Sequence, residues 1–107
     1  MLERLGGDEQ LLGEVIGIFL DGAPRQLALL RRAVGEQNAE ELEKTAHSLR
    51  GELEYLGLTE ISRRIRALEE MGSRRDLRGA EAILASIEMD LPPVLVAIAG
   101  GVPESQL

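Results

Sequence analysis

The chain has no cysteine, no tryptophan, one phenylalanine, one tyrosine and one histidine among its 107 residues. The lack of cysteine excludes disulfide bonds and zinc sites built on thiolates. With a single histidine in addition, we expect no metal site. A chain without cysteine also fits the reducing environment of the cytoplasm, which is where we expect this protein to work.

Positive charge is also scarce, because 12 lysine and arginine residues stand against 19 aspartate and glutamate residues, for a formal net charge of -7. An acidic surface repels nucleic-acid backbones and anionic lipids. We therefore expect protein partners, and neither a nucleic acid nor a membrane surface as a ligand.

Long apolar segments are missing. The N-terminus has no basic stretch followed by an apolar one, so no signal peptide is visible. The longest apolar run, around Leu91 to Val102, is short and contains two prolines. We expect no insertion into a membrane.

The alternation typical of strands is absent too, whereas apolar residues recur three and four positions apart along most of the chain. The pattern predicts an all-α protein, and the length suits one domain. Since the loops are short, we expect an antiparallel up-down four-helix bundle over residues 1–99. A short helical turn at Leu2 to Leu5 would precede it, and residues 100–107 would form a flexible tail.

The first long helix is expected after a cap at Asp8, with an apolar stripe that begins at Leu11, Leu12, Val15, Ile16 and Phe19. Because proline removes a helical hydrogen bond, Pro24 should interrupt this helix with a kink near residues 21–23. The apolar face then continues to about Val34, and Gly35 should end the helix.

The other three helices are bounded by similar signals. Asn38 and Glu41 form a candidate capping box for a helix that runs to about Tyr55. A third helix is predicted from Thr59 to just before Gly72. The fourth should begin after Asp76, break or kink at Pro92-Pro93, and restart over residues 94–98.

The only histidine, His47, lies in the second predicted helix. On a helical wheel it points about 140° away from the apolar stripe, which consists of Leu42, Ala46, Leu49, Leu53 and Leu56. The ring should therefore face solvent, either as an ordinary surface histidine or as a working one. Gly51 lies about 40° from it and weakens the helix by roughly 0.5–1 kcal/mol. Close approach of a partner to the ring would explain this glycine, and close packing of a neighbouring helix is the alternative.

The run Ala46-His47-Ser48-Leu49-Arg50-Gly51, with Leu56-Gly57 downstream, resembles the signature of histidine-containing phosphotransfer (HPt) domains of bacterial phosphorelays. The segments Leu5-Gly6-Gly7-Asp8 and Phe19-Leu20-Asp21-Gly22-Ala23-Pro24 are also similar to the family pattern.

The resemblance implies a four-helix bundle whose histidine takes a phosphoryl group from the aspartyl phosphate of a receiver domain and passes it to another receiver. On that basis His47 is the phosphoacceptor. Arg50 replaces the usual lysine that supports the phosphoryl group, and Gly51 lets the receiver approach. The family has no ATP site and no kinase activity of its own, so the receiver would bring the Mg²⁺. Response-regulator receivers are the implied partners, with a hybrid sensor histidine kinase as a further candidate.

The chain departs from the family pattern after Gly51, where Glu52-Leu53-Glu54-Tyr55 replaces the usual small residues. Glu43 and Glu54 share the helix face of His47 and are expected to modulate transfer by opposing an anionic phosphoryl group. Glu52 lies near the edge of the apolar stripe, where a carboxylate is costly, and the sequence offers no account of it. Glu69 on the third helix is the candidate acceptor that orients the ring, with an ordinary solvated glutamate as the alternative.

Other functions fit less well. No phosphate-binding loop in a strand-loop-helix context is present, and a hydrolytic triad lacks a second histidine. The main alternative is a bundle of HPt shape that docks receivers or other helices without phosphotransfer. A helical dimerisation module would need a sustained heptad seam on an exposed face, and we see none in the sequence. Because the pattern indicates a polar outer surface around one core, we expect a monomer.

Overall fold

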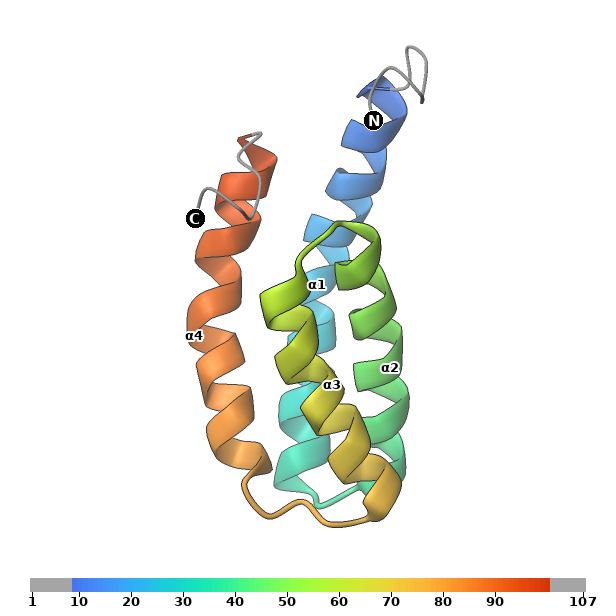
Figure 1. Ribbon diagram of the computed structural model, residues 1–107, viewed down its shortest axis with the longest axis vertical. Helices are drawn as coiled ribbons and strands as arrows, with labels where there is room; N and C mark the ends of the chain where they lie inside the picture. The colour runs from blue at the N-terminus through green and yellow to red at the C-terminus, as the bar shows by residue number, and fades with distance from the viewer. Residues whose placement is uncertain (1–8, 101–107) are drawn as a thin grey trace.

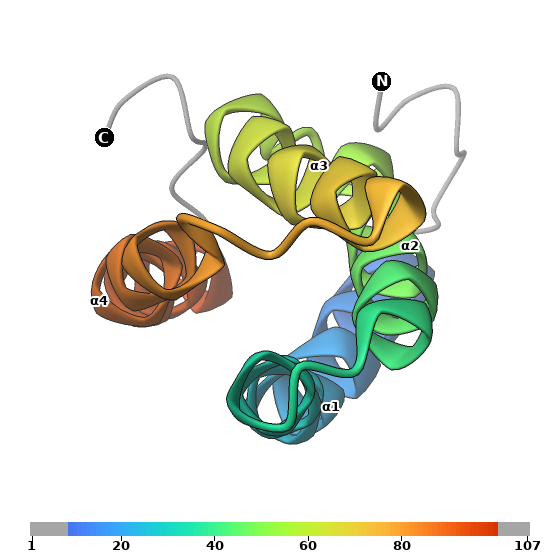
Figure 2. The same cartoon turned by 90° about the horizontal axis from the view of Figure 1, so that it is seen from below.

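The computed structural model describes residues 9–100, without the side chains of 9–13, 15 and 99, and this part of the chain contains four α-helices and no strand. The helices are α1 (Glu9–Gly35), α2 (Ala39–Tyr55), α3 (Thr59–Arg74) and α4 (Ala80–Ala99). Figure 1 shows them running alternately down and up, and Figure 2 shows them around one core, with α2 next to α3. Helix α1 packs against α2 and α4, and α3 packs against α2 and α4. The all-α prediction and the antiparallel bundle are confirmed.

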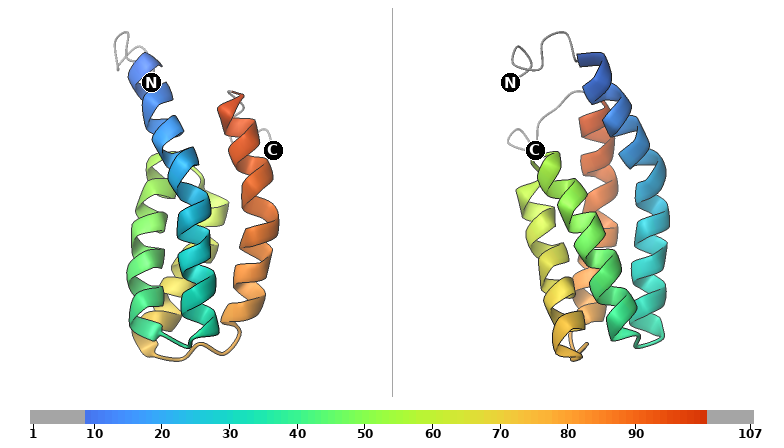
Figure 3. Two further views of the ribbon diagram at one scale, coloured as in Figure 1. Left: turned by 180° about the vertical axis from the view of Figure 1, so that it is seen from behind. Right: turned by 90° about the vertical axis from the view of Figure 1, so that its right-hand side faces the viewer.

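Pro24 does not interrupt α1, which is a single helix from Glu9–Gly35. The axis bends in the turns that precede the proline, as Figure 3 shows in both views, so the predicted kink is present while the predicted interruption is wrong. Pro24 is exposed. The carbonyl that loses its N–H partner therefore lies on the solvent side, where water can bind it.

Helix α2 begins as the sequence predicts, because the Asn38 side chain accepts a hydrogen bond from the backbone N–H of Glu41 at 3.1 Å. Only half of the predicted capping box forms. The Glu41 carboxylate accepts instead from the Thr45 hydroxyl at 3.3 Å, and the backbone N–H of Asn38 donates to Ala33. The helix ends at Tyr55, and Gly57 follows with a φ of +80°.

Helix α3 extends past Gly72 to Arg74, although the sequence predicts an end before that glycine. Gly72 is buried against the start of α2: a Cβ atom there would lie 2.7 Å from the carbonyl oxygen of Ala39 and 2.8 Å from the nitrogen of Glu43. The glycine is needed for the close crossing of the two backbones, and it does not terminate the helix. The helix ends instead at Arg74, and the C-cap residue that follows, Arg75, has a left-handed φ of 56°.

Helix α4 runs without a break through Pro92 and Pro93, so the predicted break and restart are wrong. Both prolines are exposed. As at Pro24, the carbonyls that lack an N–H partner can be hydrated, while Leu91 and Leu95 on the opposite side stay in the core. Burial of these leucines stabilises a continuous helix more than the lost hydrogen bonds destabilise it.

The core lies between the four helices and is lined by leucine, isoleucine and alanine. Its largest fully buried side chains are Leu30, Leu42, Leu49, Leu53, Leu58, Ile65, Leu68, Leu84, Ile87 and Leu91. On the outer face of α4, Met89 and Val96 are 76% and 74% exposed and lie seven residues apart. These two side chains form a short apolar strip on that helix. Their spacing is that of one heptad, but two residues do not make the sustained seam of a dimerisation helix.

No helix within residues 9–100 is long and apolar enough to cross a membrane. The predicted turn at Leu2 to Leu5, the cap at Asp8 and the tail over 101–107 fall outside the described residues.

Candidate functional site

Helix α2 presents the His47 ring to solvent, and the side chain is 68% exposed. The opposite side of the helix is buried, since Leu42, Ala46, Leu49 and Leu53 have no exposed surface. The helical wheel therefore predicts the orientation of the histidine correctly, and a histidine packed into the core is excluded.

The ring of His47 is held by a carboxylate from the neighbouring helix. His47 Nδ1 lies 2.7 Å from Oε2 of Glu69, whose side chain is 18% exposed. A carboxylate can only accept, so Nδ1 carries the proton in this contact and, in the neutral ring, the lone pair is on Nε2. The structure thus brings together the histidine and the candidate orienting residue, and it excludes the alternative that Glu69 is merely solvated.

Arg50 completes this cluster. Its Nε donates to Glu69 Oε1 at 2.5 Å and its Nη1 donates to Glu54 Oε2 at 3.1 Å. The hydrogen bond from Arg50, and to a smaller extent that from His47, lowers the pKa of Glu69 below its usual range, although burial acts in the opposite direction. The carboxylates of Glu69 and Glu54 in turn raise the already high pKa of Arg50, so Arg50 and Glu69 both stay charged.

One contact in the cluster is not a hydrogen bond. Arg50 Nη2 lies 3.2 Å from His47 Nδ1 and 3.4 Å from Glu69 Oε2. An arginine nitrogen always donates, and Nδ1 is already protonated by the shorter contact to Glu69. The two nitrogens therefore share Glu69 Oε2 as their acceptor.

The two acidic neighbours of His47 on α2, Glu43 and Glu54, differ in whether a cation compensates their charge. Glu54 is paired with Arg50 and also accepts from the Ser62 hydroxyl of α3 at 3.3 Å, so its charge is compensated. Glu43 makes no hydrogen bond or ion pair with His47 in the described part of the chain, although the i,i+4 spacing would permit one. The expected repulsion of a phosphoryl group is thus reduced at Glu54 by its arginine partner.

Gly51 has no packing role within the bundle. It is exposed, and a Cβ atom built on it would meet nothing within 4 Å. Gly22 of α1 has the same open surroundings. Packing of a neighbouring helix, the alternative explanation for Gly51, is therefore excluded.

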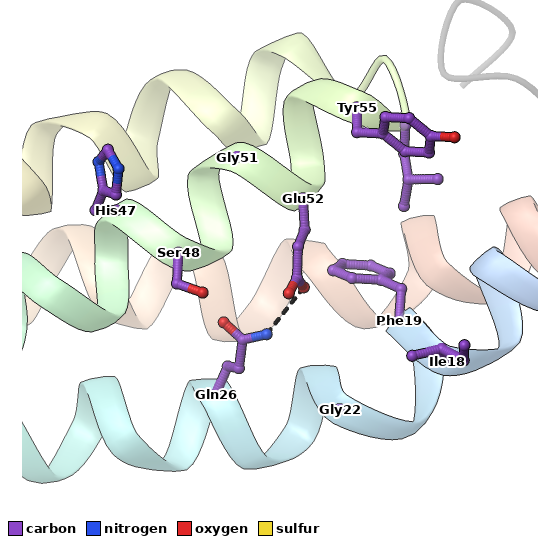
Figure 4. Close-up of a pocket in the computed structure, with 10 residues that line it drawn as sticks. Ile18, Phe19, Gly22, Gln26, His47, Ser48, Gly51, Glu52 and Tyr55 are labelled. Atoms are coloured by element: carbon purple, nitrogen blue, oxygen red, sulfur yellow. Dashed lines mark hydrogen bonds between the residues drawn. The ribbon is translucent and has the colours of Figure 1, made fainter.

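The two glycines line a groove of about 620 Å³ between α1 and α2. Figure 4 shows His47 near one end of this groove and Phe19 with Tyr55 near the other. Its lining is mainly apolar and includes Ile18, which is 73% exposed, and Tyr55, which is 70% exposed. Large apolar side chains exposed in a groove that also carries an exposed histidine are typical of a protein-binding face.

Among the described side chains, a single hydrogen bond crosses the groove. The Gln26 amide of α1 donates to Glu52 Oε1 of α2 at 2.9 Å, as the dashed line in Figure 4 shows. The amide oxygen of Gln26 is buried and has no hydrogen-bond partner. An unpaired buried oxygen costs about 1–3 kcal/mol, so the contact stabilises the fold little.

Sequence reasoning finds the residues of α2 and α3 but misses Ile18, Gln26 and Ser62. Ile18 could have been noticed, because it is a large apolar residue outside the stripe of α1. Gln26 and Ser62 carry no local signal, since their partners Glu52 and Glu54 lie on other helices.

Residues 9–100 contain no group of three or more side chains able to hold a metal ion. No curated protein and no solved structure matches the chain. The model of one family, the Hpt domain, matches residues 14–96, which include all four helices and the whole cluster around His47. The chain therefore belongs to the Hpt domain family, whose general role is histidine phosphotransfer in phosphorelay signalling.

Proposed function

We propose that this protein is a phosphorelay intermediate that accepts a phosphoryl group on His47 from the aspartyl phosphate of one receiver domain and passes it to another. The observation that carries the proposal is the exposed ring whose Nδ1 is held by Glu69 at 2.7 Å. This contact directs the lone pair of Nε2 away from the bundle and toward an approaching partner.

The transfer begins with attack of Nε2 on the phosphorus of the aspartyl phosphate. The N–P bond forms as the O–P bond breaks, and the aspartate of the receiver leaves as a carboxylate. The imidazole, protonated on Nδ1, gains positive charge, which the Glu69 carboxylate stabilises at hydrogen-bond distance. Transfer to a second receiver reverses these steps. We assign the Mg²⁺ and most of the charge stabilisation to the receiver.

Arg50 is the cation of this chain placed to meet the phosphoryl oxygens. Its Nε contact with Glu69 is largely shielded, whereas its Nη1 contact is with Glu54, which is 47% exposed. Exposed ion pairs are weak, so Nη1 can exchange Glu54 for a phosphoryl oxygen at little cost. Glu54 thereby competes with the phosphoryl group for Arg50, which makes it a modulating residue, while the open surroundings of Gly51 admit the receiver.

The presence of a single histidine makes the test direct. The purified protein is incubated with receiver domains that have been phosphorylated with acetyl phosphate, and label that is stable in alkali but labile in acid is measured. We expect such label on the unmodified chain and none on His47→Gln. Label that persists in the variant would contradict the assignment of His47 as the phosphoacceptor.

The second candidate is a bundle that docks receivers without transfer. The observation in its favour is that the Arg50 guanidinium is already engaged by two carboxylates. This candidate predicts measurable receiver binding with no label on His47 from any receiver in the panel. Phosphotransfer predicts both.

A further inference from the structure

Glu52 is the acidic residue among the side chains that line the groove. Glu54 and Glu69 share Arg50, and on the far side of the bundle Glu81 and Glu88 share Arg31. Glu52, by contrast, makes no ion pair within the described residues, and its one hydrogen bond comes from the neutral amide of Gln26. A carboxylate without a cationic partner therefore lies in the groove that His47 also lines.

The fold does not explain this carboxylate. Its bond to Gln26 fixes the amide with the nitrogen toward Glu52, and this orientation leaves the amide oxygen buried without a donor. Glu52 itself is exposed, and a small residue at position 52 would free the amide without leaving a cavity in the core. Because the contact brings little stability, a partner is the better reason for Glu52.

The position suits a residue that discriminates between partners. Glu52 lies next to Gly51 on the groove wall, among the exposed apolar side chains of Ile18 and Tyr55. A protein that covers this groove excludes water, and an unpaired carboxylate then becomes costly unless the partner supplies a cation. A partner without that cation is penalised, which is how interfaces gain specificity.

We propose that Glu52 is a specificity-determining residue. It selects receiver domains that place a lysine or arginine against its carboxylate. The inference rests on the proposed function for the identity of the partner. It adds the chemistry by which one receiver is preferred over another, and it assigns Gln26 the task of holding the carboxylate in place. Gln26 is thus a positioning residue.

The test compares matched charge changes. Glu52→Lys reverses the charge, Glu52→Gln removes it while keeping an acceptor for Gln26, and Glu52→Asp keeps it. Glu70→Lys is the control, because Glu70 is exposed on α3, outside the groove, and its contact with Arg66 is 4.0 Å long. For each variant, kcat/KM for a phosphorylated receiver that labels the unmodified chain is measured at low and high salt. This value is divided by the rate of labelling with phosphoramidate, which needs no docking.

We expect Glu52→Lys to lower this ratio about tenfold at low salt, with the loss shrinking at high salt, as happens when a charge at the edge of an interface is reversed. Glu52→Gln should fall in between, and Glu52→Asp should lose less than Glu52→Gln because it keeps the charge. Glu70→Lys should stay within about twofold of the unmodified chain. An equal loss in Glu52→Lys and Glu70→Lys, or a loss that does not depend on salt, would overturn the proposal.

Direct binding keeps this inference separate from the proposed function. The Kd of unphosphorylated receivers is measured for the unmodified chain and for Glu52→Lys. If no receiver labels His47 but binding weakens about tenfold in Glu52→Lys, phosphotransfer fails and the role of Glu52 stands. If label transfers but Glu52→Lys changes neither binding nor rate, the role of Glu52 fails and phosphotransfer stands.

Discussion

Glu69 Oε2 lies 2.7 Å from His47 Nδ1, although the two residues are 22 positions apart and belong to different helices. The contact sets the tautomer of the neutral ring, because the carboxylate accepts only from a protonated Nδ1 and the lone pair is then on Nε2. It also joins His47 of α2 to a side chain of α3 that is largely shielded from solvent.

Glu69→Gln tests this relationship. The amide can donate to Nδ1 as well as accept from it, so the ring is no longer held in one tautomer, and the negative charge that stabilises the phosphorylated imidazole is lost. We expect label transfer to His47 to slow about 10- to 100-fold, by analogy with other residues that orient a functional histidine. The initial rate of labelling measures this, with Glu70→Gln as the matched control. Equal rates in the two variants would contradict the orienting role.

Gly51→Ala should make the protein more stable and less active. Alanine is favoured over glycine inside a helix by about 0.5–1 kcal/mol, and the new Cβ would meet nothing within 4 Å. The methyl group would, however, stand beside His47 where a receiver approaches. Urea unfolding measures the gain, and the rate of transfer from a receiver measures the loss. Faster transfer in the stabilised variant would argue against close approach at Gly51.

Gly72→Ala should have the opposite effect on stability. The added Cβ would lie 2.7 Å from the Ala39 carbonyl oxygen and 2.8 Å from the Glu43 nitrogen, and both are backbone atoms that cannot move alone. We expect the free energy of unfolding to fall by about 1–3 kcal/mol, as for other overpacked sites. Urea unfolding is again the measurement, and Gly22→Ala is the control. A Gly72→Ala variant as stable as the unmodified chain would show that the two helices can separate at no cost.

The cluster also predicts a dependence of stability on pH. The pKa of Glu69 is lowered mainly by its hydrogen bond from Arg50, so the folded state binds this proton more weakly than the unfolded state does. The resulting stabilisation is present above the unfolded value of about 4.3 and disappears as the pH falls through the lower folded value. Urea unfolding between neutral and acidic pH should show a smaller loss for Glu69→Gln than for the unmodified chain. Parallel curves would show that Glu69 does not contribute.

Local signals in the sequence predict the helices well where a residue acts on its own backbone. Asn38 caps α2 as expected, because it acts through a neighbour in the chain, and α1 ends at Gly35 as expected, although the left-handed residue at that end is Gln37. The errors come from tertiary packing. Pro92-Pro93 lies in an unbroken helix because buried leucines hold both sides of it, and Gly72 serves a helix crossing that no local pattern reveals.

The site follows the same division. The exposure of His47 and the open space at Gly51 follow from helical periodicity, which depends only on position along α2. Glu69 could be chosen as the ring partner only as a candidate, because the spacing between helices decides whether it reaches Nδ1. The Gln26 contact to Glu52 could not be foreseen, since it depends on how α1 lies across α2.

His47 is held on one side by Glu69 of α3, whereas the groove opens on the other side, toward α1. Substitutions along α1 can therefore change the preferred partner without disturbing the tautomer of His47. Duplicated copies of such a gene could diverge toward separate signalling routes through a few exposed positions on one helix, each copy retaining the same reactive centre.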